Sequence, residues 1–171
     1  MFFKMKKYSL ILVYLFLCNC SKTDVALIQE EEIINTGSLD FAKTFGGSKN
    51  EVFYSIDKTI DGGYVIAGYT QSVDGDIITK TAASFDFWIQ KFSIDNTLEW
   101  QKTFGGSEDD SAASIIQTKD GGFAVLGYSK SSDTDVSVNA GSKDFWLIKL
   151  SNSGNLLWEK TFGFSGADYG T

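Results

Sequence analysis

Short apolar runs alternate with turn-forming residues along most of the chain, and the run lengths suit β-strands. The clearest set, in the second half, comprises residues 111–118, 123–129, 144–151 and 156–162. The segments 119–122 and 152–155 contain glycine and read as tight turns, whereas 130–143 reads as a long polar loop. No stretch shows the 3.6-residue period of an amphipathic helix. The pattern predicts an all-β protein built from antiparallel strands.

The same pattern occurs twice, because the sequence repeats every 58 to 59 residues. The motif Lys-Thr-Phe-Gly-Gly-Ser at 43–48 returns at 102–107, and again at 160–165 with Phe164 in place of the second glycine. The markers Asp-Gly-Gly and Asp-Phe-Trp recur at matching distances. We therefore predict a lone fourth strand, two whole repeats and the start of a third repeat. These segments are residues 38–47, 48–106, 107–164 and 165–171.

Four antiparallel strands in a unit of this length describe a β-propeller blade. The sequence thus predicts four-stranded blade-like repeats forming a partial β-propeller; a β-solenoid is the alternative, although its coils are usually shorter. The small residues at 112–114 suit an inner strand, where blades converge. Four tryptophans recur at equivalent positions and are expected to fill blade–blade interfaces rather than to stack on sugars. They are Trp88, Trp100, Trp146 and Trp158.

The first 19 residues have the pattern of a secretory signal peptide: three lysines, then an apolar run at 8–18. Eleven helical residues rise about 16 Å, which is too short to span a bilayer comfortably. The sequence Leu17-Cys18-Asn19-Cys20 resembles the lipobox of bacterial lipoproteins. On this resemblance Cys20 becomes the lipidated first residue and 20–37 a tether. A plain secretory signal is the alternative.

Several repeat motifs together resemble a known group of proteins. The order Trp-x-Lys-Thr-Phe-Gly-Gly-Ser, Asp-Gly-Gly-Phe, Gly-Tyr-Ser and Asp-Phe-Trp-Leu-Ile-Lys-Leu resembles propeller-like repeats of secreted and surface proteins of the Bacteroidota. The resemblance covers about residues 39–171 and implies a non-enzymatic extracellular β protein. Two whole repeats are fewer than the four or more blades of a closed propeller, and no type IX sorting domain follows. We therefore expect either an N-terminal piece of a longer protein or a homo-oligomeric ring.

Composition removes several kinds of chemistry. The chain has 15 basic and 22 acidic residues, a net charge of -7 and no histidine. The charge disfavours nucleic acid as a partner, and the absence of histidine excludes His-based catalysis and zinc sites. No catalytic, cofactor-binding or metal residue is assigned.

Paired acids recur in the loops, and they are the one candidate for a metal. They are Asp74 and Asp76, Asp133 and Asp135, and the run at 108–110. Such carboxylates can converge on Ca²⁺, but the spacing is not that of an EF-hand. A solvated loop, or a carboxylate capping its own turn, is the preferred hypothesis. Asp61 and Asp120 read as turn residues in the same way.

The leading functional hypothesis is a lipid-anchored outer-membrane protein, on the surface or periplasmic face, acting as a non-enzymatic binding or structural module. Its ligand would be a glycan, a protein or a cell-surface polymer, bound by loops at one rim of the propeller. The membrane contact would run through the acyl chains on Cys20. The alternatives are part of a polysaccharide-binding or glycosidase-associated system, or a non-functional fragment of a split gene.

Overall fold

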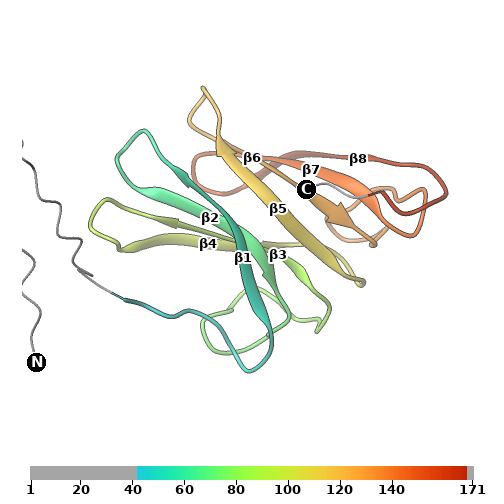
Figure 1. The fold of residues 1–171 in the computed structure, drawn as a ribbon, viewed down its shortest axis with the longest axis horizontal. Helices are drawn as coiled ribbons and strands as arrows, with labels where there is room; N and C mark the ends of the chain where they lie inside the picture. Colours follow the sequence, from blue (N-terminus) through green and yellow to red (C-terminus); the bar gives the residue numbers. More distant parts are fainter. Residues whose placement is uncertain (1–41, 169–171) are drawn as a thin grey trace, which may run out of the picture. The chain divides into compact units, whose positions relative to one another are not determined.

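The computed structural model describes residues 42–168, which form eight β-strands and no helix (Figure 1). Sheet 1 contains β1 (Glu51–Lys58), β2 (Tyr64–Thr70), β3 (Asp86–Phe92) and β4 (Leu98–Phe104). Sheet 2 contains β5 (Asp110–Gln117), β6 (Phe123–Ser129), β7 (Asp144–Leu150) and β8 (Leu156–Phe162). Each sheet keeps its strands in chain order, and every neighbouring pair is antiparallel.

The predicted fold class is confirmed. Two four-stranded antiparallel sheets follow one another as blade-like repeats of a partial β-propeller that is not closed. The strand limits read from the sequence of the second repeat agree with β5 to β8 within one residue. The predictions for residues 1–19 and 20–37, including lipidation of Cys20, concern residues outside the described part.

The two sheets share a backbone irregularity that requires glycine. The register of the first strand pair shifts between Phe53 and Ser55, and the shift recurs in the second repeat between Ala112 and Ser114. A Cβ on Gly68 of β2 would lie 1.8 Å from the carbonyl oxygen of Val52. The first two strands therefore approach each other more closely than a side chain allows.

The turns predicted at the Asp-Gly-Gly motifs are present. Gly62 and Gly121 have φ angles of 88° and 82°, in the left-handed region that glycine adopts without strain. The carboxylate of Asp61 accepts hydrogen bonds from the Thr59 hydroxyl and the Gly63 N–H. The hydroxyl of Thr59 thereby holds the pKa of Asp61 down to about 2, with help from Lys91. Asp120 makes the same turn in the second repeat.

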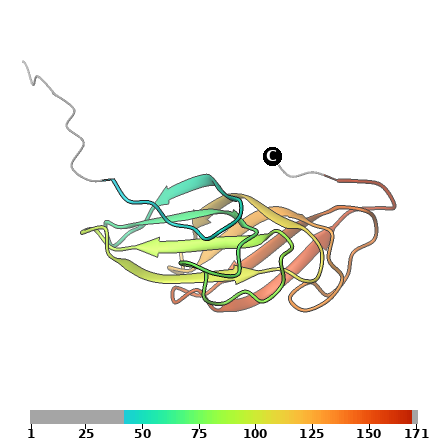
Figure 2. The same cartoon turned by 90° about the horizontal axis from the view of Figure 1, so that it is seen from below.

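The hydrophobic core lies between the two sheets, with β5 at the boundary (Figures 1 and 2). Sheet 1 contributes Val65 and Phe87, and sheet 2 contributes Val125 and Trp146; all four are fully buried. The rings of Phe87 and Trp146 are 4.6 Å apart and tilted. Ala112 of β5 is also fully buried, which agrees with the predicted small-residue inner strand. Blade-like packing thus comes from apolar side chains on alternating strand positions.

The four tryptophans do not share one environment. Trp146 is buried between the sheets, and Trp100 meets the Phe123 ring edge-on at 5.6 Å. Trp88 is buried on the other face of sheet 1, where it stacks on Phe53. Trp158 is 45% exposed. Trp100 and Trp146 thus pack between the two sheets as predicted, whereas Trp88 and Trp158 lie on faces that meet no second sheet within residues 42–168.

The predicted lone fourth strand at 38–47 lies partly outside the described residues, and its described part, 42–47, forms no strand. The physical reason is that, among the described residues, no third strand of a preceding sheet lies beside this segment to complete a ladder. Phe45 nevertheless packs on sheet 1, with its ring 5.3 Å from that of Phe92.

Candidate functional site

Two acidic residues of the β2–β3 loop bind the backbone of the first Gly-Gly-Ser segment. The N–H of Gly46 donates to Oδ2 of Asp76 at 2.9 Å, and the N–H of Ser48 donates to Oδ1 of Asp74 at 2.8 Å. Gly47 donates to Glu51 at 3.1 Å. We call this arrangement, formed by 46–48 with these three acids, the first glycine–carboxylate joint. It fixes the chain segment that enters sheet 1.

The second repeat contains an equivalent joint between the two sheets. Its three hydrogen bonds run from Gly105 to Asp135 at 3.1 Å, from Gly106 to Asp110 at 2.8 Å and from Ser107 to Asp133 at 2.8 Å. A Cβ on Gly106 would lie 2.1 Å from Oδ1 of Asp133, so this position has no room for a side chain. The joint therefore requires both glycines and acids at fixed spacing.

The joints explain the paired acids that the sequence analysis singled out as Ca²⁺ candidates. Asp74, Asp76, Asp133 and Asp135 accept hydrogen bonds from backbone amides of another loop rather than capping their own turns. Asp109 forms an ion pair with Lys130 at 2.8 Å. Between residues 42 and 168, no three acidic, histidine or cysteine side chains are grouped to hold a metal ion.

The sequence did not predict that two carboxylates at the second joint are buried: Asp110, one of the acids at 108–110 and part of the joint, and Asp86, which lies against Gly105. Asp110 is fully buried, accepts hydrogen bonds from the hydroxyls of Ser129 and Ser131, and has a pKa raised by burial. Asp86 is 8% exposed and pairs with the ammonium of Lys80 at 2.8 Å. Burial raises the pKa of Asp86 to about 6, and Lys80 offsets only part of this effect. Asp86 is the first residue of the Asp-Phe-Trp motif, which helped to define the repeat but gave no sign that this carboxylate is buried.

A hollow of about 260 Å³ opens beside the Lys80–Asp86 pair. Hydroxyl groups dominate its lining, which includes Thr79, Thr81, Thr103, Ser107 and Thr134. Asp135, whose pKa is raised by burial, also faces it. No aromatic side chain is among the residues lining this hollow. Hydroxyls, carboxylates and one ammonium can together donate and accept hydrogen bonds with a small polyhydroxy ligand.

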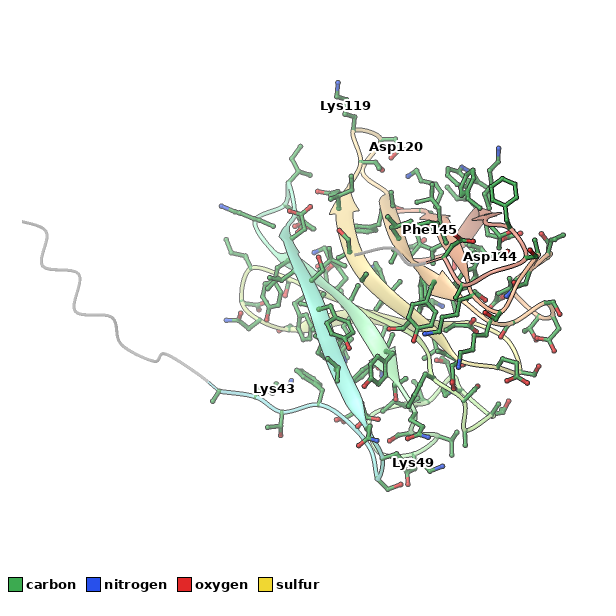
Figure 3. The ribbon with its side chains drawn as sticks, turned by 45° about the vertical axis from the view of Figure 1, so that its right-hand side comes forward. Lys43, Lys49, Lys119, Asp120, Asp144 and Phe145 are labelled. Carbon is green, nitrogen blue, oxygen red and sulfur yellow. The ribbon has the colours of Figure 1, made fainter. Side chains whose placement is uncertain are left out.

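A second hollow of about 550 Å³ lies at the other end of the strands. The β1–β2 and β5–β6 turns form it, with Lys58, Ile60 and Lys119 among the lining residues. Figure 3 shows Lys119 and Asp120 at this end and Lys49 at the opposite end. The side chain of Gln117 accepts a hydrogen bond from the Ile60 N–H at 2.8 Å, which ties the two turns together. This hollow has no buried charge and offers less for recognition than the first.

Neither a protein-family model nor a curated protein matches this sequence. Within residues 42–168 there is no helix long and apolar enough to cross a membrane. The class that the structure defines is an all-β protein of blade-like repeats.

Proposed function

We propose that this chain is a lipid-anchored protein of the bacterial cell envelope whose repeats form a non-enzymatic binding module. The ligand is a polyhydroxy compound of the glycan class. The observation that carries this proposal is the hollow of about 260 Å³, lined by hydroxyls and by the Lys80–Asp86 pair.

The hollow is held in shape before any ligand arrives. Its lining includes Gly105 and Gly106, whose amides donate to Asp135 and Asp110. Thr79 and Thr103 share a hydrogen bond of 2.9 Å between their hydroxyls. A pre-formed polar site loses less conformational entropy on binding than a flexible loop would lose. Direct contacts to a few sugar hydroxyls therefore suffice for modest affinity.

The proposed anchor rests on the first twenty residues. The lipobox-like sequence ending in Cys20 would place acyl chains at the mature N-terminus. The chain has a net charge of -7, so an acidic protein of this kind gains little from anionic lipid headgroups. Acyl chains supply the membrane affinity, on the surface or periplasmic face of the outer membrane.

Binding can be tested by titrating the protein with mono- and oligosaccharides and following amide chemical shifts. Replacing Thr79 and Thr103 together by valine removes two hydroxyls while keeping side-chain volume. We expect affinity to fall about tenfold, which corresponds to about 1.4 kcal/mol. Thr161→Val, at the position equivalent to Thr103 but outside the hollow, is the matched control. Equal weakening by both variants, or no saccharide response at all, would count against the binding site.

The anchor can be tested separately by labelling cells with an alkyne-bearing palmitate. We expect the label and the membrane fraction to be lost in Cys20→Ser and kept in Cys18→Ser. Retention of the label in Cys20→Ser would overturn the proposed lipidation site without bearing on ligand binding.

A further inference from the structure

Sheet 2 has an apolar face turned away from sheet 1. The strand register puts Phe145 opposite Phe162, Leu147 opposite Leu126 and Lys149 opposite Trp158. Because side chains alternate between the faces of a strand, these residues share the face opposite to Trp146. We call it the outer face of sheet 2. Trp158 and Phe162 on it are 45% and 52% exposed.

The equivalent face of sheet 1 is covered. Trp100 and Phe104 correspond to Trp158 and Phe162, and Phe104 is only 7% exposed. Phe87 and Ile89 correspond to Phe145 and Leu147, and both are fully buried. The difference between the two repeats is that sheet 2 packs on this face of sheet 1. The sheet 1–sheet 2 contact therefore shows how a packed sheet covers side chains at these positions of the repeat.

Residues 164–168 lie along sheet 2 in the same way that 106–110 lie along sheet 1. The N–H of Asp168 donates to the carbonyl of Lys143 at 2.7 Å, as the N–H of Asp110 donates to that of Phe85 at 2.5 Å. The side chain of Asp168 accepts from the Phe164 N–H at 3.0 Å, as Asp110 accepts from Gly106 at 2.8 Å. In the first repeat this path leads directly into β5, the strand that covers sheet 1.

We propose that the outer face of sheet 2 is the docking surface for another four-stranded sheet of the same repeat, joined through 165–168 as β5 is joined through 107–110. The sheet 1–sheet 2 interface is the template for this contact, and the outer face continues it by one repeat. The exposed aromatic side chains then become covered, as Phe104 is buried and Trp100 is partly buried in sheet 1.

A second copy of the chain fits this face less well. The face of sheet 1 that would have to meet it is already occupied, because Phe45 packs on Phe92 there. On that face Trp88 and Gln90 are fully buried. A copy's sheet 1 would have to lose these contacts before it could cover Trp158.

The chemistry of the docking sheet follows from the existing interface. It must supply hydroxyls to Asp168, as Ser129 and Ser131 supply them to Asp110. It must offer a residue without a side chain beneath Trp158, because Gly154 lies against the ring of Trp100. It must also leave room for Phe164, which is 84% exposed and stands where Gly106 stands in the second joint.

The test is to lengthen the full chain by one repeat. Duplicating residues 106–163 in tandem, directly after Gly163, gives the new junction the glycine that the joint requires. We expect the thermal midpoint to rise by about 5–10 °C in a single transition, because the added sheet buries a face that the parent chain exposes. No rise, or a separate transition for the added sheet, would overturn the proposal.

Substitution of one aromatic residue localises the effect. Phe162→Lys should leave the midpoint of the parent chain nearly unchanged and should abolish the gain in the lengthened chain. Trp158→Ser provides a second variant with the same expected pattern. If instead light scattering shows that the parent chain is a dimer, and that Phe162→Lys converts it to a monomer, a second copy covers this face and the proposal is wrong.

The proposed saccharide site lies elsewhere on the molecule. Either result therefore leaves the proposed function to be tested by its own binding experiment.

Discussion

At the residue scale, Asp86 shows that an ion pair need not compensate for burial. Its carboxylate is 2.8 Å from the Lys80 ammonium and accepts a hydrogen bond from Ser84, yet its pKa is raised to about 6 by burial. The neighbouring charge of Asp110 acts in the same direction. The cost of removing the charged carboxylate from water therefore exceeds its favourable interaction with the Lys80 ammonium.

This pKa predicts how stability depends on pH. A carboxyl group that binds its proton more tightly in the folded state stabilises the fold while protonated. The contribution of Asp86 to the free energy of unfolding should therefore fall by about 2–3 kcal/mol as the pH rises from about 4 to about 6. Urea unfolding at several pH values measures it. Asp110 and Asp135, whose pKa values burial also raises, add to the same slope.

The matched variants separate Asp86 from the other acids. Asp86→Asn should flatten the slope between pH 4 and 6. Asp95→Asn should not, because the Ser93 hydroxyl lowers the pKa of Asp95 and moves its titration below this window. An unchanged slope in Asp86→Asn would show that another group controls the pH dependence.

Gln90 offers a second prediction at this scale. It is fully buried on β3, and neither its amide nitrogen nor its amide oxygen has a hydrogen-bond partner. Ile148 occupies the equivalent position in sheet 2 and is buried without polar atoms. Gln90→Ile should raise the free energy of unfolding by about 1–3 kcal/mol, because it removes two unsatisfied polar groups.

Its control is Gln101, which is directly opposite Gln90 on β4. Gln101 accepts a hydrogen bond from the Trp88 indole at 2.9 Å and donates to the carbonyl of Asp76 at 2.6 Å. Gln101→Leu should destabilise by about 1–3 kcal/mol, because it leaves the indole N–H unpaired. Opposite signs for the two substitutions are the expected outcome, measured by chemical denaturation.

Sequence alone predicted some of these residues and not others. The roles of Asp61 and Asp120 follow from local turn chemistry, so spacing within four residues was enough. The partners of Asp74 and Asp133 lie 26 residues away in the chain, and only the packed sheets bring them together. The burial of Asp86 and Asp110 has the same origin. A local sequence pattern does not predict contacts between residues that only the tertiary structure brings together.

At the scale of elements, the strands were predictable because side-chain alternation and turn residues mark their limits. The long β2–β3 and β6–β7 loops were also recognised. The difference between Trp100 and Trp158 was not, because their sequence contexts are nearly the same. What separates them is a neighbouring sheet: Trp100 packs on Phe123 and Gly154, and its indole donates to Asn152 at 3.2 Å.

This difference predicts unequal costs for equal substitutions. Trp100→Ala should lower the free energy of unfolding by about 2–4 kcal/mol, because it opens a cavity between the sheets. Trp158→Ala should cost less than about 1 kcal/mol, since its ring is 45% exposed. Urea unfolding of the two variants gives both values. Similar costs would mean that Trp158 is covered in solution.

At the scale of the whole molecule, the two sheets share one core and should unfold together. Fully buried side chains of both sheets form one continuous cluster. Phe87→Ala and Trp146→Ala remove the two partners of one ring contact, one from each sheet. Each substitution should lower the free energy of unfolding by about 3–5 kcal/mol. Calorimetry should still show a single transition that includes both sheets. A second transition in either variant would show that the sheets are independent units.

The glycine–carboxylate joint has a consequence for how a gene of this kind changes its length. The joint is specified by a short Gly-Gly-Ser segment and a few acids, and it recurs at the same point of each repeat. Recombination between repeats that shifts the chain by 58 or 59 residues therefore regenerates an intact joint at the crossover. The one-residue difference in repeat length falls between Asp76 and Asp86, outside the loop residues that form the joint. Whole repeats can therefore be gained or lost during evolution while the connection between sheets stays the same.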